Sequence, residues 1–526
     1  MSAKVLISDE LSPAAIAVFE ERGIAVDVNV GLTKDELEKI IGSYDGLAVR
    51  SATKATPKII AAAKKLKVIG RAGIGVDNID VKAATARGII VMNTPFGNSI
   101  TTAEHAVSLM LSLARQIPAA DGSTQAGKWE KSKFLGVEIC GKTLGLIGCG
   151  NIGTIVADRA IGLKMKVIAY DPFLSEERAV QLGVEKVDLD QVFRRADFIT
   201  LHTPLTDKTR NILSADALAK CRRGVRIINC ARGGLVDEKA LAGALRSGHV
   251  AGAALDVFEA EPARDNILFG IEGVICTPHL GASTTEAQEK VALQIAEQMS
   301  DYLLTGAIGN AVNFPSISAE EAPRLKTYVK LAGQLGEFAG QLTETSIKVV
   351  RIEYSGDVAD LNVKPLTAAA LAGLLSASLA EVNMVSAASL AKERGIVVEE
   401  VTRDKAGMFE SSIRLTVKTD DLERSVAGTV GAGGRPRVID VRDIPMDFEV
   451  SPHMLFIRNS DKPGFIGKLG TLLGEASVNI ATFNLGREHA GGDAICVVAV
   501  DEPISDEVLD SVKALPNVVR ARRLTF

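Results

Sequence analysis

A glycine-rich turn between a strand and a helix constrains this chain more than any other stretch. The letters GLIGCGNIG occupy 145–153, so Gly148, Gly150 and Gly153 fill a G-x-G-x-x-G pattern directly after the apolar run 142–147. In a dinucleotide-binding βαβ unit the first glycine allows the tight turn, the second lets a pyrophosphate approach the backbone, and the third lets helix and strand pack closely. The pattern therefore predicts a nucleotide-binding sheet here.

The residues that follow complete the βαβ unit. Positions 151–163 fit a helix and 166–170 fit a second strand, which places Asp171 at its end. A carboxylate at this point accepts hydrogen bonds from the adenosine ribose and repels a 2′-phosphate. The sequence thus predicts NAD as the cofactor and not NADP. A glycine-rich turn without a ligand is the alternative.

The overall composition narrows the class of protein. The chain has 526 residues with 47% hydrophobic and 24% charged, which indicates several globular domains. A net charge of -5 argues against binding to nucleic acid or to an acidic membrane surface, since both require a basic protein surface. Its most apolar helical run, 368–379, is too short to span a bilayer, and we expect a cytoplasmic protein. The six cysteines lack a C-x-x-C pair, and no metal site is predicted.

The first 315 residues read as one α/β unit inserted into another. Residues 1–98 alternate β-rich runs with helical stretches, as in a flavodoxin-like parallel sheet. Two long helical stretches, 101–116 and 284–304, lead to the Rossmann nucleotide domain and back. We expect a substrate-binding domain at 1–98 and 283–315, a nucleotide domain at 99–282, and a cleft between them.

Past residue 315 the pattern changes to α+β. An intervening domain is expected at 316–450, with helices at 320–342 and 366–394, strands at 347–354, 413–418 and 438–441, and a turn or loose hairpin at 428–434. Arg435, Arg437 and Arg442 form either an anion site or a solvated hairpin face. Residues 453–526 follow the order βαββαβ, which is ferredoxin-like.

Polar residues end several apolar runs of the nucleotide domain. Ligands in open α/β sheets bind beyond the carboxyl ends of the strands, so these residues are candidates for chemistry. Arg232 can hold a substrate carboxylate through two parallel hydrogen bonds. His279 can take the proton of a hydroxyl while a hydride leaves, and Glu261 can orient its imidazole.

Four motifs together resemble the D-isomer-specific 2-hydroxyacid dehydrogenase family over residues 1–315: GLIGCGNIG, NCARGGLVDE, LDVFEAEP and TPHLGAST. The resemblance implies that Arg232, Glu261 and His279 are the catalytic trio. It also implies a set of residues that line the NAD site: Gly148, Gly150, Asn151, Ile152, Gly153, Asp171, Thr203, Cys230, Ala231, Arg232, Asp256, His279, Leu280, Gly281 and Ala282.

Further stretches, VRSATKAT, GRAGIGVDNID and NTPFGNS, resemble the long-form branch of that family, whose members oxidise D-3-phosphoglycerate in serine biosynthesis. Arg50 and Arg71 end strands of the first domain, and a phosphorylated substrate requires such extra cations. The resemblance assigns substrate binding to the following residues: Arg50, Ser51, Arg71, Gly73, Asn98, Arg232 and His279.

The same resemblance extends to the C-terminal parts. It implies that 316–450 is an intervening, allosteric substrate-binding-like domain and that 453–526 is an ACT regulatory domain. In relatives an ACT domain binds L-serine through positions that correspond here to Asn459, Asp461 and Asn479. It further implies a homotetramer, with Trp129 in a segment that contacts the neighbouring subunit.

Two other functions remain open at this point. A glyoxylate or hydroxypyruvate reductase of the same family would need no cations at positions 50 and 71. A non-catalytic protein that senses NADH would bind the cofactor without turnover, although the complete trio argues against it. Turnover with a phosphorylated and an unphosphorylated hydroxyacid separates the three possibilities.

Overall fold

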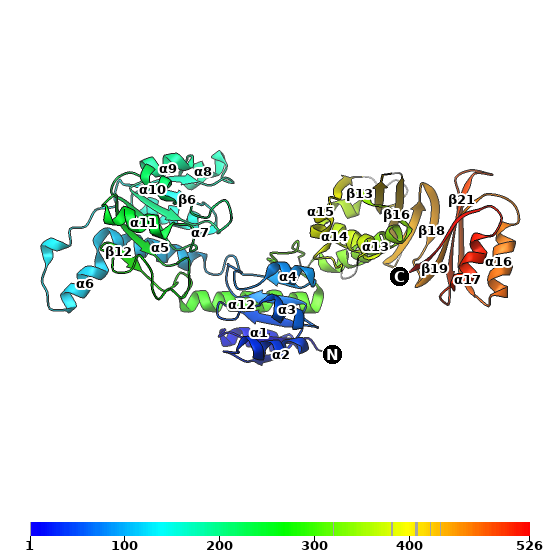
Figure 1. The fold of residues 1–526 in the computed structure, drawn as a ribbon, viewed down its shortest axis with the longest axis horizontal. Coiled ribbons are helices and arrows are strands. Elements are labelled where there is room, and N and C mark those ends of the chain that lie inside the picture. The colour runs from blue at the N-terminus through cyan, green and yellow to red at the C-terminus, as the bar shows by residue number, and fades with distance from the viewer. Residues whose placement is uncertain (1, 319, 380–381, 405–408, 421, 432) are drawn as a thin grey trace.

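The computed structural model describes residues 2–318, 320–379, 382–404, 409–420, 422–431 and 433–526. Its strands form four sheets (Figure 1). The second sheet lies at one end of an elongated molecule, the first sheet lies in the middle, and the third and fourth sheets follow at the other end. The second and fourth sheets therefore lie at opposite ends of the molecule (Figure 1).

The first sheet is parallel with strand order β2-β1-β3-β4-β5, which is the flavodoxin-like order. Its fold class was predicted correctly. The strands are β1 (Lys4–Ile7), β2 (Ala25–Val28), β3 (Gly46–Val49), β4 (Val68–Arg71) and β5 (Ile90–Met92). The helices are α1 (Pro13–Glu21), α2 (Lys34–Ile40), α3 (Pro57–Ala62) and α4 (Val81–Ala86), with a 3-10 turn at Ile41–Ser43.

The second sheet is also parallel and carries the strand order β12-β11-β10-β9-β6-β7-β8. From β8 to β11 this is the order of a Rossmann sheet, with the reversal between β6 and β9. The strands are β6 (Thr143–Ile147), β7 (Lys166–Tyr170), β8 (Glu185–Lys186), β9 (Phe198–Leu201), β10 (Val225–Asn229), β11 (Val250–Leu255) and β12 (Val274–Cys276). The helices are α6 (Ile117–Gln125), α7 (Asn151–Gly162), α8 (Glu176–Leu182), α9 (Leu189–Arg195), α10 (Ala215–Lys220) and α11 (Glu238–Arg246), with a 3-10 turn at Lys131–Lys133.

Two long helices connect the first two sheets. The chain leaves the first sheet through α5 (Ser99–Arg115) and returns through α12 (Thr285–Thr305), which packs on α1 and buries Met299 completely. The two connecting segments are in contact, because Thr101 Oγ1 in α5 and Thr284 Oγ1 before α12 lie 3.4 Å apart. This arrangement agrees with the predicted insertion, and the exact domain boundaries stay a prediction.

The third sheet has strand order β14-β13-β15-β16-β17-β18 and is antiparallel except for the β13 and β14 pair. Its strands are β13 (Ile347–Gly356), β14 (Val397–Arg403), β15 (Ser411–Thr419), β16 (Glu423–Gly431), β17 (Arg435–Val441) and β18 (Ile444–Phe448). Its helices are α13 (Ala322–Leu342), α14 (Lys364–Ser376) and α15 (Ala387–Glu393), with a 3-10 turn at Asp357–Asp360.

The prediction of one continuous helix at 366–394 was wrong. The region contains α14 and α15, and α15 begins after a turn that Asn383 holds. The Asn383 Oδ1 accepts hydrogen bonds from the backbone N–H of Val385 (3.0 Å) and of Ser386 (2.9 Å). An asparagine side chain that bonds nearby backbone favours a turn over a helix, so Asn383 sets where α15 begins.

The fourth sheet is antiparallel, with order β20-β21-β19-β22, and the predicted βαββαβ fold is confirmed. Its elements are β19 (His453–Ser460), α16 (Phe465–Glu475), β20 (Ile480–Arg487), β21 (Asp493–Val500), α17 (Asp506–Lys513) and β22 (Val518–Thr525). Phe338 of α13 joins it to the third sheet, since its ring lies 6.1 Å from both Phe448 and Phe456. Among the described helices, none combines the length and hydropathy that a membrane crossing requires.

Candidate active site

The glycine-rich turn has the backbone geometry that the pattern predicts. Gly148 has φ +95°, and a Cβ there would lie 2.6 Å from the carbonyl oxygen of His202. A Cβ on Gly153, in α7, would lie 2.2 Å from the carbonyl oxygen of Gly148, so only glycine lets the helix approach the strand. A Cβ on Gly150 would meet nothing within 4 Å, which leaves open space beside the N-terminus of α7, where Asn151 and Ile152 begin the helix.

Asp171 lies directly against this turn. Its Oδ2 accepts a hydrogen bond from the backbone N–H of Cys149 (2.8 Å), and its Oδ1 accepts one from Phe173 (2.8 Å). The carboxylate is therefore fixed at the end of β7, next to the open space at Gly150. On the facing strand end, the buried Oγ1 of Thr203 has no hydrogen-bond partner among the described residues. These groups fit the ribose and phosphates of a dinucleotide.

His202 precedes Thr203 and does not behave as an acid or base near neutral pH. Burial lowers the pKa of His202 to about 4, so its imidazole is neutral at pH 7. Its Nε2 lies 2.9 Å from Thr200 Oγ1. We therefore read this histidine as part of the wall of the cofactor site.

The loop after β10 holds Arg232 in place. Asn229, at the strand end, is buried, and its Oδ1 accepts from the backbone N–H of Ala231 (3.0 Å) while its Nδ2 donates to the carbonyl of Arg232 (2.9 Å). Cys230 is buried, and burial raises the pKa of its thiol far above the ordinary value. This loop packs on the loop after β11, because a Cβ on Gly233 would lie 1.8 Å from the carbonyl oxygen of Phe258.

Glu261 and His279 form a direct pair. Glu261 Oε2 lies 2.7 Å from His279 Nδ1, and Glu261 Oε1 accepts from the backbone N–H of Phe258 (3.0 Å). Burial alone would raise the pKa of the Glu261 carboxyl, but the bonds from His279 and Phe258 outweigh it and hold that pKa below its ordinary value. Because the carboxylate must accept, Nδ1 carries the proton and Nε2 is the nitrogen that can take one.

Asp256 supports the loop that carries His279. It is fully buried, and its oxygens accept hydrogen bonds from Thr277 Oγ1 (2.6 Å) and from the backbone N–H of Leu280 (2.7 Å) and Gly281 (2.8 Å). Burial would raise the pKa of Asp256, but these bonds and the neighbouring His105 hold it below its ordinary value. His279 itself has φ +57°, so the loop needs this support to keep a strained residue in place. Ala282 follows in the same loop.

The first sheet carries the residues that the sequence predicts to bind substrate. Arg71 ends β4, and its Nε is buried without a hydrogen-bond partner among the described residues, as is Asn98 Oδ1 before α5. Gly73 has φ +147°, and a Cβ there would lie 1.6 Å from Arg71 Nη1. Arg50 is held after β3, since its N–H donates to Asp9 Oδ2 (2.6 Å) and its Nη1 to the carbonyl of Glu10 (3.3 Å). Ser51 next to it is exposed.

Arg232 and Arg50 lie close enough to Arg71 to repel its charge, while Asp77 and Asp9 attract it. Burial, together with repulsion from Arg232 and Arg50, lowers the pKa of Arg71 to about 10. Uncompensated positive charge in a buried place is costly, and an anion offsets that cost. This repulsion and the buried Arg71 Nε, which has no partner among the described residues, both point to an anionic ligand.

Asp77 links the two sides of the site. Its Oδ2 accepts a hydrogen bond from Arg232 Nε (3.0 Å), so a residue that follows β4 pairs with one that follows β10. Arg232 Nη1 donates to the carbonyl of Ala231 (2.7 Å). The guanidinium is therefore oriented from both sides, and its Nη2 edge stays available.

Three supporting residues were not predicted as site residues: Asp77, Asn229 and His105. Asn229 ends β10 inside a motif already quoted from the sequence, so a search for polar residues at strand ends could have found it. Asp77 also stands inside a quoted motif, but it lies in the loop after β4 and away from the strand end. His105 lies on α5, and its Nε2 is 3.3 Å from Asp256 Oδ1. Only the packing of α5 against the second sheet brings it there.

The three expected regulatory residues lie in the fourth sheet unit. Asn459 is buried on β19, and its Oδ1 has no partner among the described residues. Asp461 accepts from Arg487 Nη1 (2.9 Å) and from the N–H of Gly491 (3.0 Å), while Asn479 Nδ2 donates to Asp501 Oδ2 (2.5 Å). Asn459 thus has the free acceptor, whereas the other two already hold partners within the unit.

Family models match three parts of the chain. Residues 107–281 match the NAD binding domain of D-isomer specific 2-hydroxyacid dehydrogenases, and 324–442 match the D-3-phosphoglycerate dehydrogenase intervening domain. Residues 453–517 match the ACT domain. The three matches follow the order of the second, third and fourth sheets.

Curated relatives match nearly the whole chain. A D-3-phosphoglycerate dehydrogenase of Synechocystis sp. is 46% identical over 98% of this chain and 93% of its own length. One from Methanocaldococcus jannaschii is 43% identical, covering 98% of each chain.

Solved structures match about three fifths of the chain. The TT0316 protein of Thermus thermophilus is 34% identical with a TM-score of 0.55, over 59% of this chain and 99% of its own. The NAD+-bound 3-phosphoglycerate dehydrogenase of Entamoeba histolytica is 29% identical with a TM-score of 0.52, over 60% and 99%.

Proposed function

Because this chain belongs to the D-3-phosphoglycerate dehydrogenases of the D-isomer-specific 2-hydroxyacid dehydrogenase family, we propose that it oxidises the 2-hydroxyl of D-3-phosphoglycerate with NAD. The products are 3-phosphohydroxypyruvate and NADH, and the reaction begins the phosphorylated route to L-serine. The observation that carries this proposal is the charge of Arg71, which Arg50 and Arg232 repel, beside the loops of Glu261 and His279.

Arg232 binds the substrate carboxylate in this proposal. Its Nε is held by Asp77 and its Nη1 by the carbonyl of Ala231, so the remaining N–H groups face the ligand in a fixed direction. A guanidinium held in this way pairs with a carboxylate through parallel hydrogen bonds. The carboxylate then fixes the position of the neighbouring C2.

His279 takes the hydroxyl proton. Glu261 holds Nδ1–H at 2.7 Å, so Nε2 accepts the proton from the 2-hydroxyl as the C–O bond becomes a carbonyl. The charged imidazole that results is stabilised by the ionised Glu261. A bound nicotinamide ring supplies the acceptor for the hydride that leaves C2. In the reverse direction His279 returns the proton to the ketone oxygen.

Arg71 and Asn98 bind the phosphate end. Both have a buried polar atom without a partner among the described residues, and Arg50 adds a further charge nearby. A phosphate monoester carries up to two negative charges and three acceptor oxygens, which the Arg71 guanidinium matches. Asn98 Oδ1 is an acceptor, so Asn98 can donate to the phosphate only through its Nδ2 group. An unphosphorylated hydroxyacid leaves this charge uncompensated.

The cofactor is NAD and not NADP in this proposal. The residues fit the nucleotide, because the space at Gly150 is open and Thr203 Oγ1 has no partner among the described residues. Asp171 is fixed by two backbone N–H groups at the position where a 2′-phosphate would have to lie. Its negative charge disfavours that phosphate.

Turnover with two ketoacids tests the proposal. NADH oxidation is measured with 3-phosphohydroxypyruvate and with hydroxypyruvate, for the wild type and for R71A. We expect a large preference for the phosphorylated acid in the wild type and a raised KM for that acid alone in R71A. Equal rates with both acids would favour a glyoxylate or hydroxypyruvate reductase. NADH binding without turnover of either acid would favour a sensor.

Regulation and assembly are also part of this proposal. L-serine is the proposed effector, with Asn459, Asp461 and Asn479 as its contacts, and the free Oδ1 of Asn459 supports this role. A homotetramer is supported by Trp129 and Leu135, whose apolar side chains are each 86% exposed beside α6. Cytoplasmic localisation stays a prediction.

A further inference from the structure

The first two turns of α5 lie along the segment that carries His279. Three contacts join the helix to residues 277–284, and they occur in opposite order along the two segments: Thr101 with Thr284 (Oγ1 to Oγ1, 3.4 Å), Thr102 with Gly281 (Oγ1 to the carbonyl oxygen, 2.8 Å) and His105 with Thr277 (Nε2 to Oγ1, 3.3 Å). Because α5 advances while the segment returns, the helix supports the segment along its length.

Thr102 holds the backbone that follows His279. Its side chain is buried, and its hydroxyl proton has two acceptors, the carbonyl of Gly281 at 2.8 Å and the carbonyl of Asn98 at 3.0 Å. A hydroxyl has a single proton, so the shorter bond to Gly281 takes the larger share of it. Asp256 accepts from the N–H of the same glycine (2.8 Å). Both peptide groups of Gly281 are therefore fixed, two residues after His279.

The space around Gly281 is filled from the same two sides. A Cβ on this glycine would lie 3.2 Å from Asp256 Oδ2 and 3.4 Å from Thr102 Cγ2. The loop is thus packed between β11 and α5 as well as hydrogen-bonded to both. Loss of either support leaves the loop with freedom to shift.

His105 supports the other end of the segment. Its Nε2 lies 3.3 Å from Thr277 Oγ1 and 3.3 Å from Asp256 Oδ1. Thr277 Oγ1 gives its own proton to Asp256 Oδ1 (2.6 Å), so it accepts from His105, and Nε2 of His105 carries a proton. His105 therefore donates to the hydroxyl and carboxylate that hold the loop of His279.

Asn98, Thr102 and His105 lie on one face of α5. They are spaced i, i+4 and i+7, which places them on the same side of a helix, and the Thr102 N–H donates to the Asn98 carbonyl (3.0 Å). The Asn98 side chain makes no hydrogen bond to the first turn of α5, whereas Thr284 caps α12 by accepting from the N–H of Ala287 (3.2 Å). The Asn98 amide thus stays available to the substrate.

We propose that Thr102 and His105 are positioning residues that transmit the binding of the substrate phosphate at Asn98 to His279. This inference rests on the proposed function. The phosphate fixes the start of α5 through Asn98, and the two positioning residues then fix the loop that aims His279 Nε2 at the 2-hydroxyl. Binding energy from a group that does not react is expressed in the rate of the chemical step. The phosphate therefore speeds this step as well as lowering KM.

Single-turnover rates of NADH oxidation test the proposal, because product release does not limit them. They are measured with 3-phosphohydroxypyruvate and with hydroxypyruvate for the wild type, T102V, H105L and the control S108A, whose serine is exposed on the same helix. T102V and H105L should each lose about tenfold with the phosphorylated acid and about twofold with the other. The steady-state KM of the phosphorylated acid should stay within about twofold, and S108A should match the wild type.

Conservative variants separate positioning from folding. T102S keeps the hydroxyl and H105Q keeps an N–H near the place of Nε2, so both should recover most of the lost rate. The shorter side chain of H105N should not. N98A should remove most of the advantage of the phosphorylated acid, and adding T102V to N98A should then cost less than T102V costs alone.

Each result decides for or against this coupling. Equal losses with both acids in T102V would overturn it, as would a raised KM with an unchanged single-turnover rate. A T102S protein as slow as T102V would also overturn it. A wild type without preference for the phosphorylated acid would refute the proposed substrate and the phosphate coupling together. The positioning role would then stand only if T102V slows hydroxypyruvate turnover and T102S restores it.

Discussion

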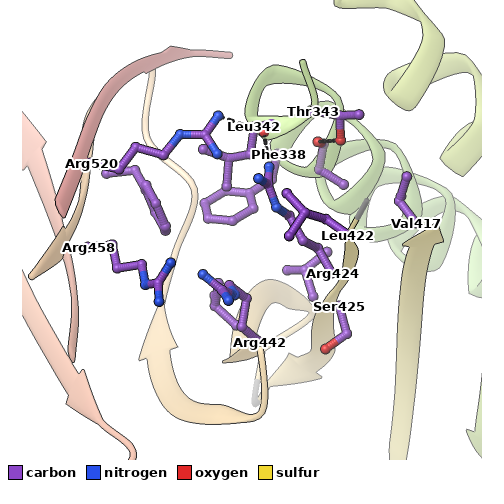
Figure 2. A pocket seen from close by; sticks show the side chains of 14 residues that line it. Phe338, Leu342, Thr343, Val417, Leu422, Arg424, Ser425, Arg442, Arg458 and Arg520 are labelled. Carbon is purple, nitrogen blue, oxygen red and sulfur yellow. Dashed lines mark hydrogen bonds between the residues drawn. The ribbon is translucent and has the colours of Figure 1, made fainter. Parts of the chain in front are cut away.

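The cleft between the first two sheets and a pocket between the last two both gather arginines, yet they are built differently. Figure 2 shows the pocket, whose wall includes four arginines: Arg424, Arg442, Arg458 and Arg520. In the cleft, Arg71 and Arg232 stand at the carboxyl ends of parallel strands, inside motifs of fixed spacing. In the pocket, Arg424 and Arg520 come from antiparallel strands almost a hundred residues apart, and no motif contains both. The residues of a site at the ends of parallel strands can be predicted from sequence motifs, whereas those of a site between two packed units can be identified only from the structure.

The cleft also contains a hydrogen-bonded carboxylate and imidazole, and the described residues of the pocket contain no such pair. Glu261 and His279 lie 2.7 Å apart in the cleft, whereas the described charges of the pocket are arginines, Asp493 and Glu344. Of these two groups of described residues, only that of the cleft can therefore move a proton. The predictions below run from the largest expected effect to the smallest.

The largest effect is expected for H279Q. Without the general base, kcat should fall by about 10² to 10⁴-fold. Steady-state kinetics with 3-phosphohydroxypyruvate measure this fall. E261Q should lose less, and turnover near the wild-type level in H279Q would refute the assignment of the base.

D256N should loosen the loop of His279. An amide keeps one acceptor oxygen but presents its NH2 group to one of the two backbone donors, Leu280 or Gly281, which should cost about 1 to 3 kcal/mol of unfolding free energy. The folded pKa of Asp256 is held low, so its contribution is complete above the unfolded value near 3.9 and is lost as pH falls through the lower folded value.

Urea unfolding of D256N and wild type measures this difference. The gap in unfolding free energy should be constant from pH 7 to 5 and shrink below pH 4. A gap that shrinks already between pH 7 and 5 would contradict the assignment. T277V, which removes one side-chain donor to the same carboxylate, is a milder control.

D171A should weaken NAD binding by about tenfold, which is about 1.4 kcal/mol. The ratio of NADP to NAD turnover should rise, because the charge that repels a 2′-phosphate is gone. Fluorescence titration with NADH and NADPH reports both affinities. An unchanged preference would mean that another residue selects the cofactor.

D77N should raise the KM of the phosphorylated acid by about threefold while kcat stays close to the wild-type value. Asp77 is 78% exposed, so its pair with Arg232 is worth no more than about 1 kcal/mol. D80N, in the same loop but at the start of α4, controls for local disturbance. A large loss of kcat would show that Asp77 does more than orient Arg232.

The smallest effect is expected for R437A. Its pairs with Asp447 and Glu449 are on the surface, and such pairs contribute less than about 1 kcal/mol. Arg435 also lies 3.8 Å from Glu449, so the solvated hairpin face that the sequence allowed describes Arg435 and Arg437. Turnover of R437A should stay at the wild-type level in steady-state kinetics. A rise in KM comparable to that of D77N would erase the distinction between the cleft and this hairpin.

The fold of the N-terminal part was predictable because its signals are local. Gly148, Gly153 and Asp171 have fixed spacing, and the buried strands are continuous apolar runs. The βαββαβ order was equally local. The separation of α14 from α15 was missed because the helical sequence pattern continues between them. Only the hydrogen bonds of the Asn383 side chain show where α15 begins.

The site was predictable where a residue follows a strand and less so where a residue supports another. Glu261 and His279 were expected to interact, and they do. His105 reaches Asp256 from α5, and Asp77 reaches Arg232 from the other sheet. Neither contact leaves a pattern in the sequence, because each depends on how two separate units are packed.

The contact between the connecting segments at Thr101 and Thr284 limits how the two halves of the cleft can move. Because the two segments that join the first and second sheets lie side by side, the second-sheet unit is expected to rotate about them as a hinge and not to slide. Displacement then grows with distance from the hinge. The backbone near Thr101 and Thr284 is then the axis of this rotation. The hydrogen bond between Asp77 and Arg232 joins the two sides of the cleft away from that axis.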